Sequence, residues 1–279
     1  MNRFGINLWN WSNNPEENIF ELISKASAIG FTAVEIPMHE GTLKYTSEIR
    51  RMLEDNGLEV TLCACMLKGR DVSNFDEKIR DNTQVYFREC IETAAEIGAK
   101  AFVGPLYAGG GKCHLLSPVK KKEEWELAVS GIKNAASLAS KHGISLCVEP
   151  LHRYRTSVVN TAKQATKLVS DIDMPNVKIH YDTFHANIEE NDVCDALEDI
   201  LKAKMLGHFH ACANNRGAPG TGHLPWKKIF SLIKRYEYEG HITMETFCTG
   251  GFDALWSPLA ESPDELAKTG IINLQKYIS

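Results

Sequence analysis

Ile144-Ser145-Leu146-Cys147-Val148-Glu149 is a short apolar run that stops on a carboxylate, and Pro150 follows it. Such a run is typical of a buried β-strand that ends where the chain leaves the sheet. Three later runs repeat the pattern in variant form: 177–182, 205–210 and 241–245. They recur at intervals of roughly 30 residues, which is about the length of one strand, one helix and two loops. The chain is therefore predicted to repeat a βα unit.

Short apolar runs alternate with stretches of helical periodicity along the whole chain. This alternation is the pattern of βα units in a parallel sheet. We find eight such pairs, and no linker, low-complexity tract or shift in composition divides them. The sequence therefore predicts one α/β domain over residues 1–279, a (β/α)8 TIM barrel. A doubly wound open sheet is the alternative, and it fits less well because no glycine-rich dinucleotide turn follows the first strand.

The expected strands are residues 4–9, 33–36, 60–66, 101–103, 144–149, 177–182, 205–210 and 241–245. The expected helices are residues 15–29, 46–56, 76–97, 118–141, 162–170, 193–202, 225–236 and 262–277. Residues 104–117 contain Gly109-Gly110-Gly111 and show no periodicity. We expect this segment to be a mobile rim or lid over the strand ends, outside the core.

The composition is that of a globular protein with a sizeable core, because 43% of the 279 residues are hydrophobic and 24% are charged. A net charge of −5 disfavours DNA or RNA as a partner. The basic run Lys120-Lys121-Lys122 is followed at once by Glu123 and Glu124, so we interpret it as the solvated start of a helix. There is no signal segment and no apolar run long enough to cross a membrane. We expect a cytoplasmic protein with no membrane partner.

The eight cysteines have no Cys-x-x-Cys pair among them. Cys63, Cys65 and Cys147 lie inside apolar runs, which favours buried small side chains over disulfides or a sulfur-ligated metal.

Four potential ligands stand at the ends of successive predicted strands: Glu149, Asp182, His210 and Glu245. In a TIM barrel the carboxyl ends of the strands form the face that carries catalysis, so these side chains are expected to converge. Three carboxylates without matched basic partners would repel one another unless a cation held them. An oxygen-rich set with one imidazole suits Mn²⁺, Mg²⁺ or Co²⁺ better than a sulfur-seeking metal.

Other polar residues lie near these strand ends in the sequence. His180 precedes Asp182 on the same face of its strand and is a candidate hydrogen-bond partner of a ligand. We expect His208 to be a strand residue that points away from His210 and binds no metal. His185 and Arg216 lie within six residues of a ligand, and His185 has a surface position as its alternative interpretation.

These residues carry a resemblance to the D-tagatose 3-epimerase and D-psicose 3-epimerase family of xylose isomerase-like barrels. The segment His180–Glu190 is similar to the Asp-Thr-Phe-His-x-Asn-Ile-Glu-Glu motif of that family. Further matching segments, in order and spacing, are Leu67-Lys68, Gly207–His210, Asn215-Arg216, Pro219–Trp226 and Met244–Phe247. The resemblance covers essentially the whole chain.

The resemblance implies one divalent cation, usually Mn²⁺, held by Glu149, Asp182, His210 and Glu245. It also implies that Glu149 and Glu245 act as an acid/base pair on a sugar substrate, through a metal-bound cis-enediolate. Inverting a carbon beside a ketone needs a proton carrier on each face of that carbon, which agrees with two glutamates. By the same resemblance, His185, Arg216 and Lys68 bind substrate, and the protein forms a homo-oligomer, a dimer or tetramer.

The chain departs from the family pattern at two positions. Arg155 stands where family members carry a second glutamate, and Ala213 replaces another glutamate of the family's His-x-Gly-Glu-x-Asn-Arg run. Both changes remove negative charge, and one adds positive charge. We therefore include Arg155 among the substrate-binding residues, as a partner for a phosphate or carboxylate on the substrate. A solvent-facing or loop-paired Arg155 is the alternative.

The function that the sequence favours is a divalent-metal-dependent ketose 3-epimerase. An aldose–ketose or hydroxypyruvate-type isomerase on the same site is the nearest alternative. A barrel endonuclease fits less well because this acidic chain lacks a basic face and the additional ligands of a multi-metal site. A sugar-binding barrel without catalysis is a further alternative, because the family's second glutamate is missing.

Overall fold

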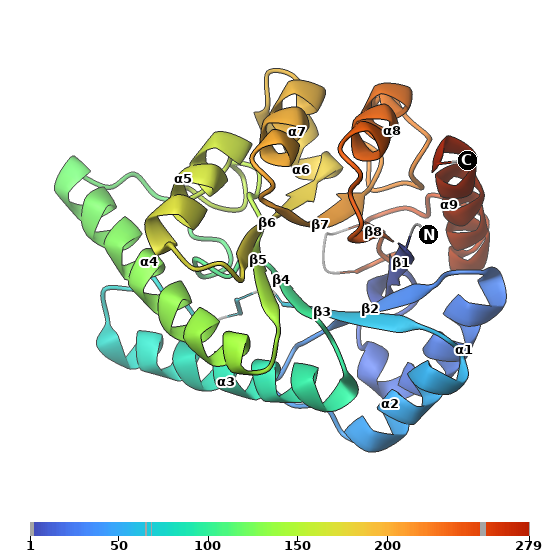
Figure 1. The fold of residues 1–279 in the computed structure, drawn as a ribbon, viewed down its shortest axis with the longest axis horizontal. Helices are drawn as coiled ribbons and strands as arrows, with labels where there is room; N and C mark the ends of the chain where they lie inside the picture. Colours follow the sequence, from blue (N-terminus) through green and yellow to red (C-terminus); the bar gives the residue numbers. More distant parts are fainter. Residues whose placement is uncertain (1–2, 65, 68, 252–254, 279) are drawn as a thin grey trace.

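The computed structural model describes residues 3–64, 66–67, 69–251 and 255–278. Within these residues, eight parallel strands pair in chain order and β8 pairs with β1, so the sheet closes into a barrel (Figure 1). The strands are β1 (Arg3–Asn7), β2 (Ala33–Pro37), β3 (Glu59–Cys63), β4 (Ala101–Gly104), β5 (Ser145–Val148), β6 (Val177–Asp182), β7 (Leu206–Ala211) and β8 (His241–Met244). Closure confirms the predicted TIM barrel and excludes the open sheet.

The helices lie outside the barrel and follow the strands in the predicted alternation (Figure 1). They are α1 (Ile19–Ile29), α2 (Thr46–Asp55), α3 (Glu77–Ile97), α4 (Pro118–Lys141), α5 (Ala162–Ile172), α6 (Thr183–Glu189), α7 (Val193–Lys202), α8 (Trp226–Arg235) and α9 (Pro263–Ile278). Two 3₁₀ turns, Leu8–Asn10 and Pro15–Asn18, replace the end of the first expected strand and the start of the first expected helix. The short helix α6 was not predicted.

Local capping explains why several helices have the expected bounds. The Ser117 hydroxyl accepts from the backbone N–H of Lys120, and Pro118 takes the first position of α4. Thr161 and Gln164 form a capping box at the start of α5. Gly98 ends α3 with a φ of 87°, a left-handed conformation that favours glycine. These signals lie in the sequence itself, within a few residues of each helix end.

Alternation along the strands separates two kinds of side chain. Residues that point outward, such as Phe102 and Phe209, are large, apolar and fully buried against the helices. The interior carries the smaller Cys63, Val103 and Cys147 at one level, where they are paired in register across β3, β4 and β5. Next to them lies a fully buried polar layer. Its residues are Asn7, Glu35, Thr61, His180, His208 and His210.

The expectation that residues 104–117 lie outside the core is wrong for the first part of the segment. Leu106, Tyr107 and Ala108 are buried, and the Tyr107 hydroxyl donates to the backbone carbonyl of Val159 at 2.9 Å. The later part is exposed, as Leu115 shows. The sequence around Tyr107 shows no periodicity from which its burial could be predicted. The burial results from contacts with the 151–160 loop, which is distant in the sequence.

A buried ion-pair network links the middle of the 104–117 segment to Asp71 and to helix α4. Lys112 Nζ lies 2.9 Å from Asp71 Oδ2 and 2.9 Å from Glu124 Oε1, and all three side chains are less than 10% exposed. Lys112 Nζ also donates to the hydroxyl of Ser73 at 2.9 Å. Burial alone would raise the pKa of Asp71, but the hydrogen bond and charge of Lys112 outweigh it and lower that pKa.

Three further sequence expectations concern the lysine run, the cysteines and membrane-spanning helices. The lysine run at 120–122 is exposed in the first turns of α4. Every cysteine of the described chain is a free thiol, and Cys63 and Cys147 are buried, whereas Cys65 lies outside the described residues. Among the described residues, no helix is both long and apolar enough to span a membrane.

We predict that Lys112→Met lowers the free energy of unfolding by about 3–5 kcal/mol at neutral pH, because it leaves two buried carboxylates without their cation. Because the pKa of Asp71 is lowered, its stabilising contribution is complete above the usual aspartate pKa and is lost as the pH falls through the lowered value. Urea unfolding at several pH values measures both effects. The control is Lys122→Met, whose ion pair with Glu126 is exposed on both sides, and it should change stability by less than about 0.5 kcal/mol. Equal stabilities for the two variants would contradict the role of the network.

Candidate active site

The structure brings the four predicted ligands together at the carboxyl end of the barrel. Glu149 follows β5, Asp182 ends β6, His210 lies in β7 and Glu245 follows β8. One ligand atom from each lies within 4.8 Å of the others, and all four side chains are buried. Asp182 and His210 are direct neighbours in the register of β6 and β7. Their convergence is the result of barrel closure, since the four residues span about a hundred positions of the chain.

The two carboxylate oxygens of Asp182 have different partners. Its Oδ1 accepts from the backbone N–H of Phe184 at 2.8 Å and so caps α6, while Oδ2 faces the site. Thr183 links the start of this helix to the end of β7, because its hydroxyl donates to the carbonyls of His210 at 3.3 Å and of Cys212 at 2.7 Å. The helix then turns His185 back toward the ligands. The sequence motif around Asp182 therefore encodes a short helix as well as a ligand.

Arg216 supplies the positive charge in this cluster. Its Nη1 donates to Asp182 Oδ2 and to Glu245 Oε2, each at 2.7 Å. The guanidinium lies over the rings of Phe184 and Phe247, with its carbon 4.0 Å and 5.1 Å from their centroids. Arg216 adopts a left-handed φ of 65°, which allows the turn after β7 to aim this side chain inward. The sequence predicted Arg216 near the site, and the structure places it at the centre.

Burial and mutual repulsion raise the pKa values of two carboxylates in the cluster. Burial raises the pKa of Glu149 well above its ordinary value, and the neighbouring Glu245 and Asp182 raise it further. Burial also raises the pKa of Asp182, with Glu245 acting in the same direction and Arg216 against it. Like charges at this spacing are stable together only when a cation or protons neutralise them. The cluster is therefore suited to positive charge.

The donor set fits a divalent cation on chemical grounds. It offers three carboxylates and one imidazole, the combination that favours oxygen-seeking ions such as Mn²⁺, Mg²⁺ and Co²⁺. His210 Nδ1 faces Glu245 Oε2 at 3.5 Å and makes no hydrogen bond to another described residue. A buried ring nitrogen that is aimed into a set of carboxylates is a natural metal ligand.

Glu35 stands behind His210 and was missed by the sequence analysis. This fully buried carboxylate of β2 has Oε1 2.8 Å from His210 Nε2 and 2.8 Å from the Asn7 amide that donates to it. Its Oε2 accepts from the Thr61 hydroxyl at 3.0 Å. Burial would raise the pKa of Glu35, but His210 and His208 outweigh it and hold that pKa well below the usual value. The signal for Glu35 in the sequence was an acid in the middle of an apolar strand.

The expectation that His208 points away from His210 is wrong. The two rings are 5.0 Å apart, and His208 Nε2 lies 2.8 Å from Glu35 Oε2 inside the barrel. Residues at i and i+2 of a strand share a face, and the curvature of the closed sheet brings both imidazoles to the same carboxylate. His180 lies on the same side as Asp182, as expected, with Nδ1 3.8 Å from Glu149 Oε2.

His185 is buried, so its alternative interpretation as a surface residue is wrong. Its Nδ1 accepts from the backbone N–H of His152 at 3.2 Å, and its Nε2 lies 3.7 Å from Asp182 Oδ2 and 3.8 Å from Glu149 Oε1. Burial lowers the pKa of His185 well below its ordinary value, and the charges of Arg216 and, more weakly, Arg155 act in the same direction. His185 Nε2 also lies 3.2 Å from Arg216 Nη2, so the two side chains contact each other directly.

The two arginines of the loop after β5 differ in position. Arg153 leaves the site to form an ion pair with Glu189 of α6, with Nε 3.0 Å from Oε1. Arg155 is half-buried and near enough to influence His185 electrostatically. Lys68 lies outside the described residues. Of the predicted substrate contacts, His185 and Arg216 lie against the four clustered side chains.

Comparison with known proteins gives a consistent picture. A family model described as a xylose isomerase-like TIM barrel matches residues 23–277. The chain is 31% identical to a D-psicose 3-epimerase of Agrobacterium fabrum, over 89% of this chain and 86% of that protein. It is 29% identical to a 3-dehydro-D-guloside 4-epimerase of Escherichia coli, over 82% and 87%. A crystal structure of D-psicose 3-epimerase in the presence of D-fructose superposes with a TM-score of 0.89 at 28% identity and covers 99% of each chain.

We predict that Arg216→Met lowers the stability of the metal-free protein by about 3–5 kcal/mol, because it removes the cation from between two buried carboxylates. Added Mn²⁺ is expected to recover most of this loss, since an ion can take the place of the guanidinium. Urea unfolding with and without Mn²⁺ measures both effects. Arg235→Met is the matched control, because Arg235 pairs with Glu198 at the surface. If Mn²⁺ stabilises neither the Arg216 variant nor the control, the cluster does not accept a cation.

Proposed function

The chain belongs to the xylose isomerase-like TIM barrel family and is a carbohydrate epimerase or isomerase, and we propose that it is a divalent-metal-dependent ketose 3-epimerase. One observation carries this proposal: Glu149, Asp182, His210 and Glu245 converge in a buried cluster at the catalytic end of the barrel. The names of its relatives, a D-psicose 3-epimerase and an L-ribulose 3-epimerase among them, support the choice of reaction.

The two glutamates suit proton transfer on opposite sides of one carbon. Glu149 and Glu245 enter the site from β5 and β8, while Asp182 and His210 between them complete the ion's ligand set. A base beside the ketose takes the proton from the carbon next to the carbonyl, and an acid on the other face returns one. Burial and the neighbouring carboxylates raise the pKa of Glu149, which favours its protonated form as the proton donor.

A divalent cation bound by these four residues would polarise the ketone and so make the neighbouring C–H more acidic. Asp182 and His210 are suited to hold the cation rather than to transfer protons. The backbone N–H of Phe184 orients Asp182, and Glu35 orients His210. Such support keeps the ligands in place while the glutamates exchange protons.

His185 and Arg216 are suited to bind substrate hydroxyls. Arg216 bridges Asp182 and Glu245, and an ion among those carboxylates would free its donors for the sugar. His185 is oriented by the backbone N–H of His152, and its Nε2 faces Arg216 Nη2 at 3.2 Å, so the two side chains form one substrate-facing pair. These contacts would orient the sugar with its reacting carbon between the glutamates.

Epimerisation at carbon 4 is a second candidate, because a relative at 29% identity is named as a 3-dehydro-D-guloside 4-epimerase. The chemistry is the same when the ketone lies at carbon 3. A metal-supplemented screen of ketohexoses, ketopentoses and 3-keto sugars in D₂O distinguishes these reactions, because NMR shows which carbon gains deuterium. Deuterium at carbon 3 of a 2-ketose supports the first proposal, and deuterium at carbon 1 or 2 identifies an aldose–ketose isomerase instead.

We predict that Glu149→Gln and Glu245→Gln each lower turnover by roughly 10²- to 10⁴-fold, because an amide cannot carry the proton. Glu190→Gln is the matched control: Glu190 accepts from the backbone N–H of Ala162 beside the site, and an amide oxygen can replace it. Steady-state kinetics and deuterium exchange measure the effect. Near-normal exchange in either site variant would remove that glutamate from the acid/base pair.

We also propose that Arg155 binds an acidic group of the substrate. Arg155→Met should then lower kcat/KM for a phosphorylated or carboxylated ketose by roughly 10- to 100-fold and leave neutral ketoses unaffected. Arg153→Met is the control, because Arg153 pairs with Glu189. Equal activity of the Arg155 variant on every substrate would refute this assignment.

A further inference from the structure

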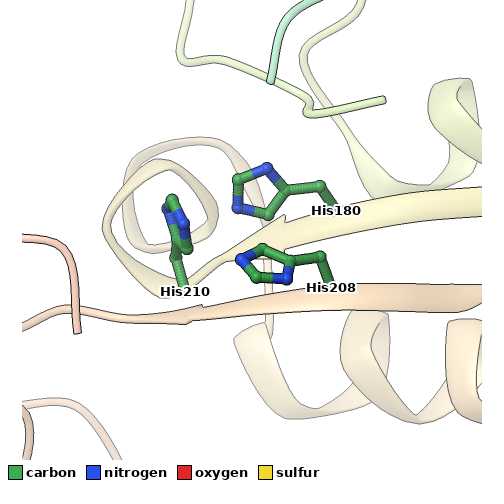
Figure 2. A group of neighbouring side chains, drawn as sticks. All are labelled: His180, His208 and His210. Carbon is green, nitrogen blue, oxygen red and sulfur yellow. The ribbon is translucent and has the colours of Figure 1, made fainter. Parts of the chain in front are cut away.

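Three imidazoles meet inside the barrel, below the cluster of carboxylates. His180 comes from β6, and His208 and His210 come from β7; Figure 2 shows their rings turned toward one another. The ring centroids of His180 and His210 are 4.0 Å apart, and that of His208 is 5.0 Å from each. One ring nitrogen from each lies within 4.8 Å of the others, and all three side chains are at most 1% exposed.

The hydrogen bonds within this group are incomplete. Neither nitrogen of His180 makes a hydrogen bond to any residue of the described chain, and the same holds for His208 Nδ1. Buried polar atoms nearly always have a partner, and a histidine with two such nitrogens at the centre of a protein is unusual. A methionine or leucine could fill this space without that cost. The three rings therefore indicate an occupant with affinity for imidazole nitrogen.

Glu35 gives this group the charge that a cation needs. Its oxygens lie 2.8 Å from His208 Nε2 and 2.8 Å from His210 Nε2, and its own position is fixed by Asn7 and Thr61. A carboxylate beside imidazoles is a common arrangement around bound metal, either as a ligand or as the partner that orients the rings. Apart from Glu35, the group offers nitrogen, whereas the ligands above it offer mainly oxygen.

We propose that His180, His208, His210 and Glu35 form a second cation site, which takes a nitrogen-seeking transition metal ion of the Zn²⁺ type. A tetrahedral zinc ion needs its nitrogen ligands about 3.4 Å apart. The present limit of 4.8 Å is somewhat wider, so small side-chain rotations would close the rings on the ion. Imidazole nitrogens favour Zn²⁺ over Mg²⁺ or Mn²⁺, which distinguishes this site from the one above it.

The two sites share His210, and this couples them. Its Nδ1 faces Glu245 in the upper site, and its Nε2 faces Glu35 in the lower one. A neutral imidazole has a single lone pair for a metal, so one ring serves one ion at a time unless it loses its second proton. Zn²⁺ in the lower site should therefore weaken binding of the catalytic ion. This antagonism rests on the proposed function of the upper site, whereas the lower site itself does not.

Zn²⁺ binding to the metal-free protein, measured by equilibrium dialysis with elemental analysis, tests the lower site. Asp182→Asn weakens the upper site alone, and His180→Gln changes the lower site alone. We expect the Asp182 variant to retain one tightly bound Zn²⁺ and the His180 variant to bind Zn²⁺ in the lower site at least 100-fold more weakly. His241→Gln is the control, because His241 is a barrel histidine that pairs with Glu59 outside the group. Zn²⁺ binding by the double variant Asp182→Asn with His180→Gln equal to that of the Asp182 variant would overturn the proposal.

Two further measurements test the lower site and its coupling to the upper site separately. Intense visible bands of tetrahedral Co²⁺ should appear in the wild type and the Asp182 variant and be lost in the His180 variant, whose fold is checked by circular dichroism. Mn²⁺ release by Zn²⁺, followed by electron paramagnetic resonance, tests the antagonism. Zn²⁺ should release Mn²⁺ from the wild type more readily than from the His180 variant. Equal release from both would mean that Zn²⁺ displaces Mn²⁺ in the upper site and would overturn the coupling.

Discussion

Burial of three carboxylates at one end of the barrel is the constraint on which the rest of the site depends. Glu149, Asp182 and Glu245 bring like charges together where water cannot screen them. Arg216 relieves part of this repulsion by donating to two of them. A protein keeps such an arrangement when a bound cation and a reaction make use of it, which is why this cluster indicates catalysis more strongly than any of its members alone.

Buried polar groups continue from the carboxylate cluster into the interior of the barrel. Most barrel interiors are filled by branched apolar side chains, but this one places Glu35 and several histidines at its centre. Glu35 accepts from side chains of three other strands, so it ties β1, β3 and β7 to β2 by hydrogen bonds. The same bonds fix the orientation of His210, so its other ring nitrogen faces Glu245 in one direction. Packing of the barrel interior and the geometry of the cluster at its mouth thus depend on the same carboxylate.

The fold was predictable where the signals are local. The bounds of α4 and α7 match the expected ones residue for residue, because a capping side chain precedes each of these helices. Helix α6 was missed because its residues were interpreted as a ligand motif, and its cap is Asp182, one of the ligands. Burial of Tyr107 was missed because it depends on Val159, which is far away in the sequence.

The sequence by itself determined the repeated βα units, the barrel that eight of them favour, and the four carboxylate and imidazole side chains at the strand ends. Strand and helix periodicities and the residues at strand ends are local properties of the chain. Only the tertiary structure decided the distances across the barrel. Glu35 meets His210 because closure brings β2 and β7 to the same interior, and Arg216 reaches Asp182 through a turn with left-handed backbone. Alternation along one strand predicts which way a side chain points, but not which strand it will face. That choice is made when the eighth strand pairs with the first.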